Sequence, residues 1–172
     1  MVNMRPFTAF EQKNLKFLVN HNVKFTQVEI TPTGLGKGIL DSTAPMRAYF
    51  LENGIHNYEE QLQGQEHKQI KAACILTDTT QFFTKVSFYR PNTKKGDPRM
   101  WVYGFGSYTE GNDIHVLFWH EKTLYSINIT HIDIEKCYNS AIITPMQEVL
   151  KAINQEGNSV SEELLGRFRA VK

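Results

Sequence analysis

From about residue 68 onward the apolar residues change to a period of two, and this change limits the chain to folds built around a sheet. Ile70, Ala72, Cys74 and Leu76 would form one face of a strand, and Phe82, Thr84, Val86 and Phe88 would form one face of the next, with the turn residues 78–80 joining the two into a hairpin. The same pattern predicts further short strands at 99–104, 114–119, 123–129 and 132–135. Many short strands of this kind are typical of a small barrel or a strongly curved sheet.

Helices are expected on both sides of the strand region. The apolar spacing predicts an amphipathic helix over 7–20, which a strand over 24–31 follows. The glycine-rich run 33–38 is expected to be a flexible loop. Ser42 or Thr43 can cap the next helix. Because helices flank a largely antiparallel sheet, the sequence predicts the α+β class.

Composition indicates one globular domain. The chain has 172 residues, of which 41% are hydrophobic, and this length can bury a substantial core. No apolar run is long enough to span a bilayer, and we expect no secretory signal after Met1–Arg5. Cys74 and Cys137 lie in apolar contexts, and we expect both to be buried free thiols. These features predict a cytoplasmic monomer without a membrane partner.

A cluster of positive charge is the most informative local feature. The formal net charge is only +1, so a nucleic-acid site must come from such clustering. The segment 89–101 holds four cations against one anion, and two prolines and a glycine shape it. We expect a stiff loop whose donors contact phosphates and base edges; a solvated hairpin tip is the alternative. The candidate contacts are Arg90, Asn92, Thr93, Lys94, Lys95, Asp97, Arg99 and Trp101.

A second candidate segment begins at Thr31 and includes a glycine-rich run. It differs from a phosphate-binding P-loop, because Thr31 stands where that motif needs glycine and Gly38 stands where it needs Ser or Thr. A contact to a DNA phosphate near the start of the following helix fits these residues better. The candidate contacts in this segment are Thr33, Lys37, Ser42, Thr43 and Arg47.

Other functions have weaker support in the sequence. A nuclease dependent on Mg²⁺ would use Glu66 and Lys68, with Asp41 or Glu59 as the second carboxylate. A protein-interaction domain would use the last helix, and a single-strand platform would use the aromatic residues Trp101, Tyr103, Phe118 and Trp119. The six histidines show no metal-binding spacing, so we expect structural histidines, no catalytic residue, no metal and no cofactor.

Three segments resemble a known family. The residues 29–43, 54–65 and 89–101 are similar to the N-terminal domain that precedes the catalytic domain in some restriction endonucleases of the MvaI/BcnI type. The closing residues 161–172 resemble the helix that leads into the nuclease in those proteins. The resemblance extends over about residues 25–172.

The resemblance implies a fold, a function and a domain organisation. Such domains are similar to the effector-binding domain of EcoRII, a seven-stranded open pseudobarrel shared with plant transcription factors, which grips the major groove between two arms. The arms would correspond to Lys37–Arg47 and Arg90–Trp101, and the site would be similar to CC(A/T)GG. Residues 1–158 would form the DNA-binding domain, and 159–172 would lead to a covalently linked nuclease domain. We therefore expect a recognition domain of a Type II (IIE-like) restriction–modification enzyme that is not itself catalytic.

Overall fold

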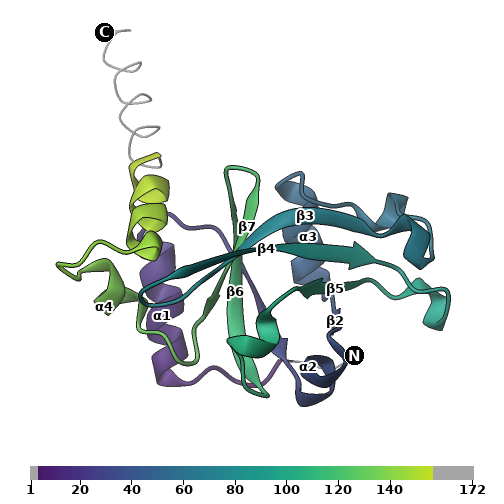
Figure 1. Ribbon diagram of the computed structural model, residues 1–172, viewed down its shortest axis with the longest axis horizontal. Coiled ribbons are helices and arrows are strands. Elements are labelled where there is room, and N and C mark those ends of the chain that lie inside the picture. The colour runs from purple at the N-terminus through teal and green to yellow at the C-terminus, as the bar shows by residue number, and fades with distance from the viewer. Residues whose placement is uncertain (1–3, 157–172) are drawn as a thin grey trace, which may run out of the picture.

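The computed structural model describes residues 4–156, and Figure 1 shows their arrangement. Seven strands form one mixed sheet in the order β1-β6-β7-β3-β4-β5-β2, which curls into a nearly closed barrel. The neighbours β3 and β7 run parallel, and the other neighbours run antiparallel. The strands are β1 (Thr26–Ile30), β2 (Leu40–Asp41), β3 (Gln69–Leu76), β4 (Gln81–Tyr89), β5 (Arg99–Val102), β6 (Asp113–His120) and β7 (Thr123–Asn128).

Helices pack on the sheet and connect its strands. The helices are α1 (Ala9–Asn20), α2 (Pro32–Lys37), α3 (Ala44–Glu52), α4 (Ile134–Tyr138) and a final helix over 145–156. Short 3-10 turns are η1 (Tyr58–Glu60), η2 (Gln65–His67), η3 (Lys94–Gly96) and η4 (Phe105–Ser107). The predicted α+β class and the seven-stranded, mostly antiparallel barrel are confirmed at this level.

The middle of the sheet is buried on both of its faces. In β3 the four consecutive residues 73–76 are all apolar and all buried, as expected for a strand covered on both faces. Ala73 and Ile75 belong to one hydrophobic cluster, and Cys74 and Leu76 belong to a second cluster on the opposite face. The hydrophobic core is therefore divided in two by the sheet.

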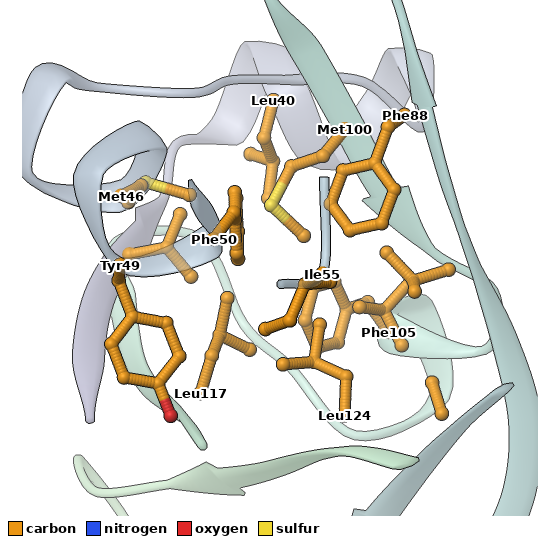
Figure 2. Packing of buried hydrophobic residues seen from close by; sticks show 14 of the residues in the cluster. Leu40, Met46, Tyr49, Phe50, Ile55, Phe88, Met100, Phe105, Leu117 and Leu124 are labelled. Carbon is orange, nitrogen blue, oxygen red and sulfur yellow. The ribbon is translucent and has the colours of Figure 1, made fainter. Parts of the chain in front are cut away.

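The first cluster joins the sheet to α3. Phe50 of α3 packs edge-on against Phe88 of β4, with ring centroids 5.1 Å apart. Figure 2 shows these side chains together with residues from β2, β5, β6 and β7. The second cluster lies under α1, α4 and the final helix, where Leu18, Ile134 and Leu150 are fully buried. Each cluster thus combines elements from distant parts of the chain.

Two of the predicted elements are wrong. The run expected to be a flexible loop forms α2, because the Thr31 hydroxyl caps it by accepting from the Gly34 N–H and Pro32 occupies its first turn. The strand expected over 132–135 is replaced by α4, where the Asp133 side chain accepts from the Lys136 N–H. In both places a capping residue overrides a weak local pattern.

The predictions for the two cysteines and for the helix after residue 43 are confirmed. Cys74 and Cys137 are both free and buried. The helix predicted after Ser42 or Thr43 is α3, with Thr43 at its N-cap position and Pro45 in its first turn. Among residues 4–156, no helix combines the length and the apolar character that crossing a membrane requires. The helix predicted over 159–172 lies outside the described residues.

A buried ion pair fixes the start of α1. Glu11 is fully buried, and its carboxylate accepts from the Arg5 guanidinium at 2.6 and 2.8 Å and from the Thr130 hydroxyl at 2.6 Å. Thr8 and Glu11 also form a reciprocal capping box. The Arg5 guanidinium is the largest cause that lowers the pKa of Glu11 to about 2. This network holds the N-terminal segment against the turn that follows β7.

Candidate nucleic-acid interface

The pairing of β2 with β5 brings the two predicted DNA-binding segments to one edge of the sheet. Asp41 lies opposite Arg99 in the ladder, and the Ser42 N–H donates to the Pro98 carbonyl at 2.9 Å. The helix α2 precedes β2, and the connection over 90–98 precedes β5. Because β2 and β5 are antiparallel, α2 adjoins the Met100 end of this ladder and the connection over 90–98 adjoins the Asp41 end, so the two segments flank the same edge from its two ends (Figure 1).

Close packing joins α2 to β5. Gly38 ends α2 in the left-handed conformation with φ of 66°, which favours glycine. It lies against the indole of Trp101, whose ring atoms would be 3.7–4.0 Å from a Cβ at this position. Trp101 in turn packs edge-on against Phe105, with centroids 5.5 Å apart. Trp101, which the sequence predicts as a DNA contact, is therefore part of the packing that positions α2.

Arg90 is directed into its own loop. Its Nε donates to the Gly96 carbonyl at 2.8 Å, and its Nη1 donates to the carbonyls of Gln61 and Tyr58 at 3.1 and 3.4 Å. The Gly64 N–H donates to the Arg90 carbonyl at 2.8 Å. These bonds connect the two ends of the β4–β5 connection with the segment over 58–64.

A buried tyrosine holds the β2–β5 edge. The Tyr58 hydroxyl donates to the Arg99 carbonyl at 2.8 Å and lies 2.7 Å from the Ser42 hydroxyl. Burial raises the pKa of Tyr58. Arg47 donates from Nη1 to the Ser42 carbonyl. Ser42 and Arg47, both predicted to contact DNA, thus have internal partners, and sequence reasoning missed Tyr58 because nothing local marks its long-range bonds.

Gln61 is a second residue that the sequence analysis missed. It is buried, and its Nε2 donates to the carbonyls of His67 and Phe88, both at 2.9 Å. Its Oε1 lies 2.9 Å from Nε2 of His56, whose pKa is lowered mainly by burial. Because the Gln61 carbonyl also accepts from Arg90, this residue links the barrel wall to the β4–β5 connection. The isolated sequence 61–65 gives no signal for this role.

Six of the remaining predicted residues are exposed. Lys37 of α2 and Lys95 of η3 are exposed, and Lys95 has φ of 57°. We call the exposed residues of both segments the two-segment surface; they are Thr33, Lys37, Asn92, Thr93, Lys95 and Asp97. Thr43 and Arg99 beside this surface are half-buried, and the Arg99 Nε is buried without a hydrogen-bond partner among the described residues. The side chain of Lys94 lies outside the described part of the structure.

Glu66 and Lys68 of the nuclease alternative each lie close to another side chain. Glu66 is exposed, and its closest basic group is the neighbouring His67 at 3.7 Å. The Lys68 ammonium lies 5.9 Å from the centre of the Tyr89 ring. Two groups of side chains within residues 4–156 could hold a metal ion, and neither includes Glu66, Asp41 or Glu59.

The aromatic residues form no common platform for bases. Phe118 is fully buried and stacks on Tyr125, with centroids 5.4 Å apart. Trp101 and Trp119 pack against the first hydrophobic cluster, on the other face of the sheet from Phe118. Tyr103 lies under the Lys85 ammonium at 5.1 Å. These residues therefore serve mainly packing.

The fold and this edge define a class of protein: an α+β, nearly closed, seven-stranded barrel. The β2–β5 edge of this barrel is flanked by two segments that carry the exposed lysines Lys37 and Lys95. Comparisons of the chain with protein-family models, with curated proteins and with solved structures found no significant match. The resemblance to EcoRII-type effector domains accordingly remains a prediction from the sequence.

Proposed function

We propose that the chain binds double-stranded DNA in a sequence-specific manner, with the two-segment surface facing the major groove. The supporting observation is the β2–β5 pairing, which joins two segments that are distant in the sequence along one edge of the sheet, with an exposed lysine in the segment at each end of the ladder. Positive charge on two separate supports suits a duplex, because phosphates flank the groove on both sides. By the resemblance, the chain would be the effector domain of a Type II (IIE-like) restriction endonuclease that reads a site similar to CC(A/T)GG.

The side chains have separate roles in this proposal. Lys37 and Lys95 contact phosphates, because they are exposed ammonium groups at the tips of their segments. Asn92 offers an amide that matches the edge of adenine. Arg99 is half-buried beside this surface and is the candidate for guanine, because a guanidinium can donate two hydrogen bonds to the guanine edge. Arg90, Ser42, Arg47 and Trp101 position these groups through their internal contacts.

The test is a selection of bound sequences from randomised duplexes in EDTA, followed by salt titrations of the selected duplex. Arg99→Ala should relax the preference at one base pair by about 1–3 kcal/mol. Lys37→Ala and Lys95→Ala should weaken binding to all sequences alike and reduce the salt slope by about 1 each. Lys16→Ala, which removes an exposed charge from α1, is the control and should change nothing.

Two outcomes would contradict the proposal. Selection without enrichment of any sequence would rule out specific recognition. Unchanged binding in Lys37→Ala and Lys95→Ala would rule out the two-segment surface. Plasmid cleavage that requires Mg²⁺ and is lost in Glu66→Gln would instead support the nuclease alternative.

A further inference from the structure

A second polar site lies where the turn before β6 meets the turn after β7. Glu110 comes from the first turn, Asp113 is the first residue of β6, and His131 comes from the second turn. All three side chains line a pocket of about 290 Å³. Sequence reasoning treated His131 as structural, since its partners are 18 or more positions away in the chain.

The three side chains bring one possible ligand atom each close together. His131 Nε2 lies 3.0 Å from Asp113 Oδ1 and 3.8 Å from Glu110 Oε2. One ligand atom of each residue lies within 4.8 Å of the others. Ligand atoms around a tetrahedral ion with bonds of about 2.0–2.1 Å are about 3.3 Å apart. The observed separations bracket this value, and the exposed Glu110 side chain is free to adjust.

Asp113 is oriented as a metal ligand needs to be. It is buried, and its Oδ2 accepts from the Glu110 N–H at 2.8 Å and from Asn128 Nδ2 at 2.9 Å. These bonds occupy one carboxylate oxygen and leave the other directed at His131. Ligating carboxylates in metal sites are commonly fixed by outer hydrogen bonds of this kind.

Among residues 4–156, His131 is the only side chain that forms an ion pair with the Glu110 or Asp113 carboxylate. Arg5 acts electrostatically on Asp113, but its guanidinium is already paired with Glu11. Two carboxylates therefore face a single imidazole nitrogen, which can offer only one proton to one of them. A divalent cation between the three atoms would satisfy both carboxylates at once.

We propose that Glu110, Asp113 and His131 bind one divalent transition-metal ion of the Zn²⁺ class. The imidazole ligand favours this class over Mg²⁺ and Ca²⁺, which prefer oxygen ligands alone. Three protein ligands leave a coordination position open toward the pocket, where water or a small ligand can complete the shell. The ion also tethers the turn over 110–113, in which Gly111 packs against Pro32 at the start of α2.

The experiment titrates the untagged 172-residue chain with Co²⁺, followed by its visible ligand-field bands, and with Zn²⁺, followed by calorimetry. One site per chain is expected, and Zn²⁺ should raise the midpoint of thermal unfolding. Glu110→Gln and His131→Gln should each weaken the affinity about tenfold or more. Both side chains are more than half exposed, so these variants should keep the fold, which circular dichroism checks.

Two controls separate this site from casual binding. His67→Gln removes a histidine that also lies beside a carboxylate but has no third ligand nearby. Glu121→Gln alters the other histidine–carboxylate group of residues 4–156, in which the closest carboxylates approach different nitrogens of His120. Both controls should bind the metal as the unmodified chain does.

The proposal is overturned if neither metal binds, or if binding is unaffected by Glu110→Gln and His131→Gln. It goes beyond the proposed DNA binding, which is expected to persist in EDTA. Loss of the metal signal and loss of sequence-specific DNA binding can therefore be observed separately.

Discussion

Arg90 and Arg99 come from the same cationic segment, yet their surroundings give them different tasks. Arg90 donates to three backbone carbonyls, whereas the Arg99 Nε has no partner among the described residues. A charged donor shared among carbonyls stabilises a loop, because hydrogen bonds from an ionised donor are stronger than those between neutral groups. Arg90 is therefore a positioning residue in our interpretation.

Replacement of Arg90 tests this role. Arg90→Ala should lower the free energy of unfolding by about 1–3 kcal/mol, since it leaves carbonyls of the loop without their donor. Arg90→Lys should not restore stability, because an ammonium lacks the planar fork of the guanidinium. Urea denaturation measures both variants, with Lys95→Ala as the exposed control from the same loop. A variant of full stability that loses base discrimination would instead make Arg90 a reading residue.

The sequence could not separate these arginines. Composition and proline content predicted a shaped cationic loop over 89–101, and a shaped loop is present. The Arg90 guanidinium bonds to carbonyls because the segment over 58–64 packs beside the β4–β5 connection. No local sequence pattern predicts this long-range packing. The same reason explains why Tyr58 and Gln61 were missed.

At the level of elements, the accuracy of the sequence-based expectations follows the strength of the local signal. The alternating segments that became β3 and β4 carry many apolar residues, so their pairing overrides small local conflicts. The short helices α2 and α4 each depend on one capping residue, Thr31 and Asp133. In α2 the glycines of 33–38 favour a loop in the sequence pattern, so the capping signal of Thr31 was outweighed. Seven strands in one barrel came from the family resemblance, since alternation alone does not fix the order of strands.

The cap of α1 leads to a prediction about acid stability. Because the pKa of Glu11 is about 2 in the folded chain and about 4.5 ordinarily, its ionised form stabilises the fold above pH 4.5. This contribution is lost as the pH falls toward 2. Glu11→Gln should therefore cost about 2–3 kcal/mol at pH 7, and the difference from the unmodified chain should shrink between pH 4.5 and 2. Urea denaturation at several pH values measures this difference.

Exposed carboxylates provide the comparison for Glu11. Glu52→Gln at the end of α3 should leave stability within about 0.5 kcal/mol across the same pH range. If Glu11→Gln shows the same pH dependence as the unmodified chain, the buried ion pair with Arg5 does not contribute to acid stability.

For the whole molecule, the division of the core by one sheet has a consequence for cooperativity. β3 and β6 contribute alternate side chains to both clusters, so neither cluster can be lost while the other keeps its strands. Both tryptophans pack against the first cluster, whereas Phe118 belongs to the second. Tryptophan fluorescence therefore reports on the first cluster, on the face of the sheet opposite Phe118.

Phe118→Ala tests whether the two clusters unfold together. The substitution should cost about 3–5 kcal/mol, because the side chain is fully buried. The midpoints by tryptophan fluorescence and by far-ultraviolet circular dichroism should fall by equal amounts. Ile143→Ala, on an exposed loop, is the control and should shift neither midpoint. Separate midpoints in Phe118→Ala would mean that the clusters are independent folding units.

The order of strands also governs how the chain can fold during its synthesis. β2, β3, β4 and β5 are contiguous in the chain and can pair early, whereas β1 has to wait for β6 and one edge of β3 has to wait for β7. A nascent chain that ends near residue 110 thus carries two strands whose partners do not yet exist. Such late, long-range pairing is slow, and it exposes strand edges to other chains in the meantime.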